Sequence, residues 1–592
     1  MKKTLLFSVA LAGLMLGSCS SSDDLNGGGN NTGSNQSGNG YVAFNINLPS
    51  QAGGSSRAND DFNAGMKSEY DVKDATLLIF EGSSESAAQF KGAYTLNTAP
   101  WKNNGQTDNI TTTSATIVKE IATPTSSDHC YALVVLNKND VFTVNENKSI
   151  TMKDATATFS GTYKQFAESL SEEDLTKNGF YMANAPLASK AGGATDPAGA
   201  EINTLANLDG KIKKTESEAK SAPAQIYVER GVAKVTMQND PSTAPNKVDG
   251  STKPDGTSSV GFEITSWVLD NTNKKTYLVR STDGFGDWTS LFSNSTSLLA
   301  ANKYRFVGSN AVADHLYRTY FAKDANFDQT GNTAALAAGD LVTRSNPTFV
   351  NKFGNDNPQY CFENTFDVAC QNDNMTTRVL IKAKLNSGET FYVFNGDQNT
   401  IYPIDEVKNE IKKYFLTENE AWIKANVTPA TGKSEVNGDD LDVEITDAAG
   451  KVSITSITFK SGVTVSSSAT VPTNYDEVLK RIGSIDEYKN GESYYFVRIK
   501  HFGDDMTPWN TDETPKPSNL VYPTDNQAGN YLGRYGVLRN NWYDIAVEGV
   551  KGLGSATVPA VTPTTDDELK SYIAVKINVL SWAKRTQGAI LH

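Results

Sequence analysis

The segment YVAFNINLPSQAGGSSRAND, residues 41–60, joins a strand pattern to a loop that carries a single basic residue, Arg57. Small and polar residues surround that arginine, and a loop of this kind is open to a protease. Apolar side chains fall at every second position of the strand, the period expected when one face is buried: Val42, Phe44, Ile46 and Leu48. The segment therefore predicts a half-buried strand followed by a cleavage point between Arg57 and Ala58.

A second strand of the same pattern lies near the end of the chain, in SYIAVKINVLSW, residues 571–582. A connector with prolines and acidic residues precedes it. The apolar face shifts at Leu580 and Trp582, as a bulge would cause. Its apolar positions again alternate with small or polar ones: Ile573, Val575, Ile577 and Val579.

Two strands of one pattern can fill the same groove. Cleavage after Arg57 would remove the first strand and leave apolar side chains and unpaired backbone groups exposed, a template for another chain. The last strand of a neighbouring copy would cover these apolar side chains and pair these backbone groups, as in donor-strand complementation. Because such a contact runs head to tail, it builds a filament. The alternative is that both strands simply pair inside one sheet.

The first residues have the pattern of an export signal rather than of a folded domain. Two lysines precede a short apolar run, and Leu16-Gly17-Ser18-Cys19 has the form of a bacterial lipobox. We expect residues 1–18 to be a lipoprotein signal peptide, Cys19 to carry the lipid, and residues 19–40 to be a disordered tether. An ordinary signal peptide with an incidental cysteine is the alternative.

Length and composition predict several strand-rich domains. The chain has 592 residues, which is too long for one ordinary core, and its 24 tyrosines and 25 phenylalanines favour strands. We expect a mainly β fold with an N-terminal β-sandwich over residues 41–228, a C-terminal β-sandwich over 229–558, and a connector with the last strand over 559–592. Helices are expected over residues 162–175 and 404–426.

Charge and cysteines exclude some classes of function. A formal net charge of -14 disfavours nucleic acid as a partner. Cys130 lies in the apolar run CYALVVLN and predicts a buried strand, whereas a bridge between Cys361 and Cys370 stays open.

Motifs of catalysis and metal binding are weak in this chain. The sequence holds neither H-E-x-x-H nor G-x-S-x-G, and Gly432-Lys433-Ser434 lacks the rest of a phosphate loop. The loop from Asp324 imitates a calcium loop but ends on Ala335 where the closing glutamate belongs. We predict no catalytic residue, no metal site, no cofactor and no enzyme activity, with a weak ion site near Asp324 left open.

Several short motifs, in order along almost the whole chain, resemble those of one family: the lipobox, GGSSRAND, CYALVVLN, NGFYMANAP, YVERGVAKV, SYYFVRIKHF, LRNNWYDIAVEGVKGLG and SYIAVKINVLSW. The sequence resembles the type V pilus fimbrillins of Bacteroidales, especially the shaft subunit of the short, Mfa-type fimbriae. The resemblance implies two transthyretin-like β-sandwich domains and a lipidated precursor in the outer membrane. It also implies release by an Arg-specific surface protease and polymerisation on the cell surface.

Carried onto this sequence, the resemblance makes Cys19 the lipidation site, Arg57 and Ala58 the cleavage site, and Val42, Phe44, Ile46 and Leu48 the displaced face. Ile573, Val575, Ile577 and Val579 become the donor face. The implied partners are identical subunits, accessory anchor and tip subunits, the protease, and host or bacterial receptors in adhesion and biofilm formation. The alternatives are an anchor or tip subunit, or a surface glycan-binding lipoprotein.

Overall fold

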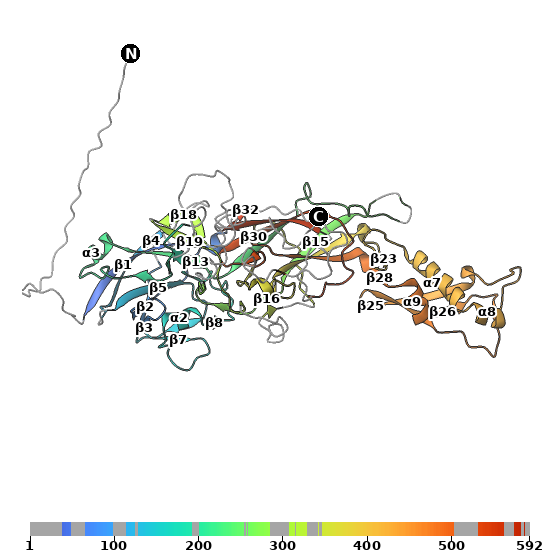
Figure 1. The fold of residues 1–592 in the computed structure, drawn as a ribbon, viewed down its shortest axis with the longest axis horizontal. Coiled ribbons are helices and arrows are strands. Elements are labelled where there is room, and N and C mark those ends of the chain that lie inside the picture. Colours follow the sequence, from blue (N-terminus) through green and yellow to red (C-terminus); the bar gives the residue numbers. More distant parts are fainter. Residues whose placement is uncertain are drawn as a thin grey trace, which may run out of the picture.

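The protein is an elongated, mainly β molecule, so the predicted fold class is confirmed (Figure 1). The structure is a computed structural model. It describes residues 38–48, 66–98, 114–124, 128–191, 200–253, 256, 259–284, 307–313, 315–327, 341–342, 346–501, 522, 531–561, 573–581 and 585–586. None of the helices in these ranges is long and apolar enough to cross a bilayer.

The N-terminal sandwich is built on one long sheet of order β3-β2-β5-β9-β13-β1-β4, with β12 pairing β5. Its strands are β1 (Asn39–Asn47), β2 (Ala75–Gly82), β3 (Gln89–Thr95), β4 (Ser114–Ala122), β5 (His129–Leu136), β9 (Met182–Asn184), β12 (Ala206–Asn207) and β13 (Ala224–Arg230). A small hairpin of β6 (Phe142–Val144) and β7 (Ile150–Met152) lies apart from this sheet.

This sheet closes on itself because its two ends touch. The Lys119 ammonium of β4 donates to the Thr95 carbonyl of β3 at 3.1 Å, and the Ala122 amide donates to the Tyr94 hydroxyl at 3.2 Å. The buried residues inside run from Val42 to Val232, with Leu278 and Val279 added from further along the chain, and include all four apolar side chains of the first predicted strand. Among the described residues of this half, the helices are α2 (Tyr163–Ala167) and α3 (Glu216–Ser221).

The C-terminal sandwich packs two sheets over a second core. One sheet contains β21 (Gln359–Cys361), β14 (Ala233–Gln238), β30 (Asn541–Val550), β31 (Ile573–Ser581) and β32 (Arg585–Thr586), in that order. The other contains β15 (Phe262–Asp270), β22 (Arg378–Leu385) and β29 (Glu492–Arg498). Buried residues from Ala233 to Leu553 fill the space between them, while Leu278 and Val279 from within this range pack into the N-terminal core instead.

An outer unit, absent from the predicted organisation, projects at the far end of the molecule from β1 (Figure 1). Its sheet has the order β23-β28-β26-β25, with β23 (Phe391–Phe394), β25 (Leu441–Ala448), β26 (Lys451–Phe459) and β28 (Ile485–Tyr488). Its helices are α7 (Ile404–Glu418), α8 (Glu420–Asn426) and α9 (Tyr475–Ile482). Val407, Ile411 and Phe415 of α7 are buried in a core of this unit's own.

Shorter elements complete the described part of the chain. A four-stranded sheet joins β11 (Ile202–Asn203), β10 (Leu187–Ala188), β19 (Leu316–Thr319) and β18 (Val307–Ala313). Two-stranded pairs join β16 (Thr272–Asn273) to β20 (Leu341–Val342), β17 (Thr276–Tyr277) to β8 (Leu170–Ser171), and β24 (Val427–Thr428) to β27 (Thr464–Val465). The 3-10 turns are η1 (Lys67–Glu69), η2 (Val368–Cys370), η3 (Asn386–Gly388), η4 (Gly438–Asp440) and η5 (Lys489–Gly491).

Two local expectations are corrected. The helix expected over residues 162–175 ends at Ala167, because the chain then enters β8, which pairs with β17. The bulge expected near Leu580 lies instead on the partner strand, where the register shifts between Val547 and Gly549 and leaves Glu548 as the extra residue. By contrast, the predicted helix over 404–426 is present as α7 and α8.

Candidate polymerisation site

The first strand, β1, lies next to last in its sheet, with a partner on each side. On one side, β1 pairs with all nine residues of β4 in antiparallel register, from Asn39 opposite Ala122 to Asn47 opposite Ser114. On the other side, Phe44 to Asn47 pair in parallel with β13, and Tyr41 exchanges two backbone hydrogen bonds of 2.8 Å with Lys213. Removing β1 would therefore open a groove with unpaired backbone on both walls.

The apolar face of β1 is part of the core. The relative exposures of its side chains are 0% for Val42, Phe44 and Ile46 and 4% for Leu48. Burial of such a side chain contributes roughly 1.5–3 kcal/mol, so the four together contribute about 6–12 kcal/mol before ordering costs. The groove is thus deep enough to hold a strand firmly.

Polar side chains fix the register of β1 against the groove walls. The Asn45 amide donates to the Gln225 side-chain oxygen at 2.9 Å, and the Asn47 amide donates to the Ile226 carbonyl at 3.2 Å. Asn45 and Asn47 alternate with the apolar residues of β1 and therefore belong to its polar face. A donor strand that carried Lys or Asn in place of these two residues would meet the polar groups of Gln225 and Ile226.

The proposed cleavage site, Arg57 and Ala58, and the proposed lipidation site, Cys19, lie outside the described residues. The nearest described residues on either side of the cleavage site are Leu48, at 4% exposure, and Met66. A cut between these two points would separate β1 from the rest of the chain and leave only non-covalent contacts between them.

The chain beyond the proposed cut is anchored at Glu69, whose exposure is 0%. One Glu69 carboxylate oxygen accepts from the Lys234 ammonium at 2.8 Å and from the Tyr360 hydroxyl at 2.6 Å. The other accepts from the Met66 amide at 3.0 Å, and the Glu69 carbonyl accepts from Arg230 Nε at 2.8 Å. These partners come from β13, β14 and β21, so Glu69 ties the N-terminal segment to both sandwiches.

The electrostatics of this anchor are those of a buried ion pair. Burial lowers the pKa of Lys234, against the opposing effect of the Glu69 carboxylate. The Lys234 ammonium also lies 3.9 Å from the centre of the Trp542 ring, which stabilises the charge further. Burial likewise lowers the pKa of Arg230 to about 10. Loss of the carboxylate would leave Lys234 charged and without its counter-ion.

The predicted donor strand, β31, pairs with the body of its own chain. Its nine residues lie antiparallel to β30, with Ile577 opposite Ile545. On its other edge, the described residues give β31 only two further partners, Thr586 and Arg585 of β32. Strand β31 is thus as long as β1, and each strand has one full-length partner, but the second partner of β31 covers two residues where β13 covers four residues of β1.

Other candidate sites have structural roles. Asp324 is buried, and its carboxylate oxygens accept from the amides of Asn326 and Thr365 and from the side chain of Asn273, at 2.6–2.9 Å. Burial raises the pKa of Asp324 to about 7. Within the described residues, no cluster of His, Cys, Asp and Glu side chains could hold a metal ion.

The three cysteines of the body, Cys130, Cys361 and Cys370, are buried and form no disulfide. The bridge between Cys361 and Cys370 is not formed. Burial raises the pKa of the Cys130 thiol to about 12, and Glu81 and Asp209 add to the effect. The thiol is therefore an apolar filler of β5, as the sequence predicted.

The groove walls and the Glu69 anchor were not identified from the sequence as parts of the site. The alternation in SATIVKEIA did predict β4, and Ala115, Ile117 and Ile121 are its buried face. Nothing in the local sequence, however, indicates that β4 pairs with β1. Glu69 gave no signal either, because its partners lie more than 150 residues further along the chain.

Comparison with known proteins identifies the C-terminal region. Residues 519–588 match the family model "Major fimbrial subunit protein type IV, Fimbrillin, C-terminal". This range contains β30 and β31. No curated protein is similar to the chain at a significant level.

Three solved structures share weak likeness with the whole chain. A proposed cell adhesion protein from Parabacteroides distasonis has 12% identity and a TM-score of 0.35, covering 92% of this chain and 98% of that one. A proposed cell adhesion protein from Bacteroides eggerthii has 12% identity and a TM-score of 0.30, with coverages of 94% and 100%. A fimbrial assembly protein from Parabacteroides distasonis has 11% identity and a TM-score of 0.25, with coverages of 59% and 84%. Likeness at this level does not establish a shared fold.

Proposed function

We propose that this chain is a structural subunit of a cell-surface fimbria, because residues 519–588 match a family model of fimbrillin C-terminal regions. We assign it to the shaft. The precursor is exported as a lipoprotein anchored at Cys19 in the outer membrane, an Arg-specific protease cuts between Arg57 and Ala58, and β31 of a neighbouring copy replaces β1. The resulting filament supports adhesion and biofilm formation and carries no enzyme activity.

The observation that carries this proposal is the difference between the two strand positions. In the groove, β1 pairs along its full length with β4 and over four residues with β13, whereas β31 pairs along its full length with β30 and over two residues with β32. A strand that moves from the β31 position into the groove therefore gains a longer second partner. Each added backbone hydrogen bond contributes about 0.5–1.5 kcal/mol net. We expect these added hydrogen bonds to favour exchange between copies once β1 has been cut away.

The covalent attachment of β1 would keep the precursor from polymerising. While β1 is covalently attached, it fills the groove at a high effective concentration, and an incoming strand cannot compete. Cleavage changes β1 into a separate peptide that can be lost by dilution. The cut is thus the step that starts assembly, and the anchor at Glu69 keeps the rest of the chain in place.

The proposal is tested at the cleavage site. Treatment of the precursor with an Arg-specific protease is expected to give a species that starts at Ala58 and forms heat-resistant ladders on denaturing gels. Arg57→Ala and Arg57→Lys should both remain monomeric, because neither presents an arginine at the cut. Ala58→Ser, which keeps the arginine, should assemble like the wild type.

The readouts are N-terminal sequencing and gel electrophoresis without boiling. Ladders from either Arg57 variant would refute cleavage-triggered assembly. A lipidated, uncut chain within surface fimbriae would indicate an anchor subunit instead of a shaft subunit.

A further inference from the structure

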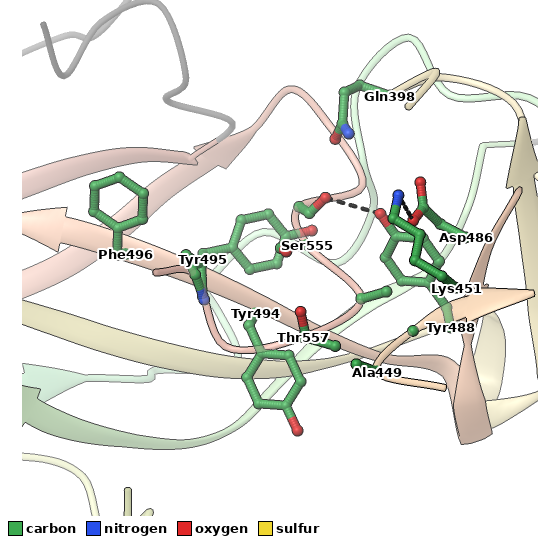
Figure 2. A pocket seen from close by; sticks show the side chains of 14 residues that line it. Gln398, Ala449, Lys451, Asp486, Tyr488, Tyr494, Tyr495, Phe496, Ser555 and Thr557 are labelled. Atoms are coloured by element: carbon green, nitrogen blue, oxygen red, sulfur yellow. Dashed lines mark hydrogen bonds and ion pairs between the residues drawn. The ribbon is translucent and has the colours of Figure 1, made fainter. Parts of the chain in front are cut away.

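A cavity of about 300 Å³ lies where the C-terminal sandwich, the outer unit and the connector after β30 meet (Figure 2). This volume is at the lower end of the range for small-molecule sites. Strand β29 contributes consecutive aromatic side chains, Tyr494, Tyr495 and Phe496, and the outer unit contributes Lys451 and Asp486. The cavity lies apart from β1 and belongs to the body that remains after the proposed cut.

The walls of the cavity are held rigidly. Tyr494 and Ser555 exchange two backbone hydrogen bonds of 2.9 Å, which fix the connector against β29. The Tyr488 hydroxyl donates to the Gly554 carbonyl at 2.8 Å, and the Tyr495 hydroxyl donates to the Gly552 carbonyl at 3.0 Å. Both rings are therefore set in place before any ligand arrives, which lowers the ordering cost of binding.

The polar groups of the cavity have unused hydrogen-bonding capacity. Gln398 extends its amide toward the cavity, and its Oε1 atom is buried with no hydrogen-bond partner (Figure 2). An unsatisfied buried acceptor of this kind costs about 1–3 kcal/mol. Lys451 pairs with Asp486, and the exposures of the two side chains are 59% and 16%. The ammonium and the carboxylate can each make further hydrogen bonds.

We propose that this cavity binds one neutral sugar ring of a glycan. The paired charges of Lys451 and Asp486 cancel, so the site favours neither an anion nor a cation. A sugar hydroxyl can donate to Gln398 Oε1 or Asp486 and accept from Lys451. Tyr494, Phe496, Ala556 and Pro559 also line the cavity and supply its apolar part, which suits the C–H face of the sugar. A purely apolar ligand would leave the Gln398 acceptor unsatisfied.

The inference is tested by saturation-transfer NMR on the full chain. The probes are the methyl glycosides of glucose, galactose, mannose and N-acetylglucosamine at millimolar concentration. At least one should give a signal with the wild type. Gln398→Leu, which removes the acceptor, and Lys451→Met, which removes the donor, should each weaken that signal about fivefold or more. Gln89→Leu makes the same change as Gln398→Leu on an exposed position of β3 and should leave the signal unchanged.

Melting curves of all variants establish that each one is folded. Because Lys451 is largely exposed, Lys451→Met tests the site even if Gln398→Leu is unstable. The absence of a signal from all four glycosides would overturn the inference. Equal signals from the wild type and Lys451→Met would do the same, as would binding of N-acetyl-alanyl-alanine methylamide in place of the sugars.

Discussion

At the scale of single residues, Glu69 connects the proposed maturation to the stability of the body. It is fully buried and binds Lys234, Tyr360 and Met66, while its carbonyl binds Arg230. A buried carboxylate with this many donors has its charge fully compensated. The segment after the cut therefore stays bound to both sandwiches without any contribution from β1.

We predict that Glu69→Gln lowers the free energy of unfolding by about 3–5 kcal/mol at neutral pH, because it leaves the Lys234 ammonium buried without a counter-ion. Burial already lowers the pKa of Lys234 below its unfolded value. The folded variant therefore holds fewer protons than the unfolded chain, and part of the lost stability should return as the pH rises toward 10. Urea denaturation at pH 7 and pH 9 measures both effects.

The double variant Glu69→Gln/Lys234→Met is the matched control. Without the buried charge, it should lose less stability than Glu69→Gln and show no recovery at high pH. A Glu69→Gln protein whose stability equals that of the wild type would show that the anchor contributes nothing.

At the scale of elements, strands β1 and β31, each nine residues long, have different neighbours. Strand β1 has two walls and a buried apolar face, whereas β31 lies near the edge of the second sandwich. Pairing of β31 with its own chain satisfies that strand until a groove becomes available. After exchange, strand β30 of the donor copy would lose its partner β31, and this loss reduces the net free-energy gain of the exchange.

We predict that Ile577→Asp blocks assembly of the cleaved protein, whereas Lys576→Asp reduces it only slightly. In the alternating sequence of β31, Ile577 belongs to the apolar set and Lys576 to the polar set. A carboxylate on the apolar face would enter the groove core unpaired, at a cost of several kcal/mol. Ladder formation after protease treatment compares the two variants.

A deletion of residues 572–592 gives the matching control. The truncated chain should accept a donor strand but give none, so it should cap ladders formed by the wild type. Equal assembly by Ile577→Asp and Lys576→Asp would show that the donor face is assigned to the wrong side of β31.

At the scale of the whole molecule, separate cores make the parts independent. The N-terminal core, the C-terminal core and the core of the outer unit contain different residues. The chain enters the outer unit through β23 and leaves it through β28. These two strands pair with each other, with Phe394 opposite Ile485. Its position at the far end from β1 keeps it clear of the groove (Figure 1).

We predict that Phe415→Ala destabilises only the outer unit, by about 3–5 kcal/mol, because this side chain is fully buried in that unit's core. Hydrogen exchange measured by mass spectrometry should accelerate over residues 404–482 and stay unchanged in β1 and β4. Phe166→Ala, a matched change in the N-terminal core, should accelerate exchange in the N-terminal sandwich instead. Acceleration throughout the chain in both variants would mean that the three cores unfold as one.

The sequence by itself determined the elements whose pattern is local. Alternating apolar residues predicted β1, β4 and β31 nearly at their observed bounds, since a half-buried strand imposes a period of two on its own residues, and the apolar run CYALVVLN predicted β5. The same pattern predicted the buried face of β1. This local pattern did not predict the short elements. Strand β8 stands where the end of a helix was predicted, because its partner, β17, lies about 100 residues away in the sequence.

Only the tertiary structure decided which strands are neighbours. The place of β1 between β4 and β13, the pairing of β1 with Lys213, the Glu69 anchor and the 300 Å³ cavity all join segments far apart in the chain. Such contacts leave no periodicity in the sequence, because each residue contributes only one group to a partner distant along the chain. The alternation of side chains indicates that a strand is buried on one face. Only the fold determines which other strands and side chains cover that face.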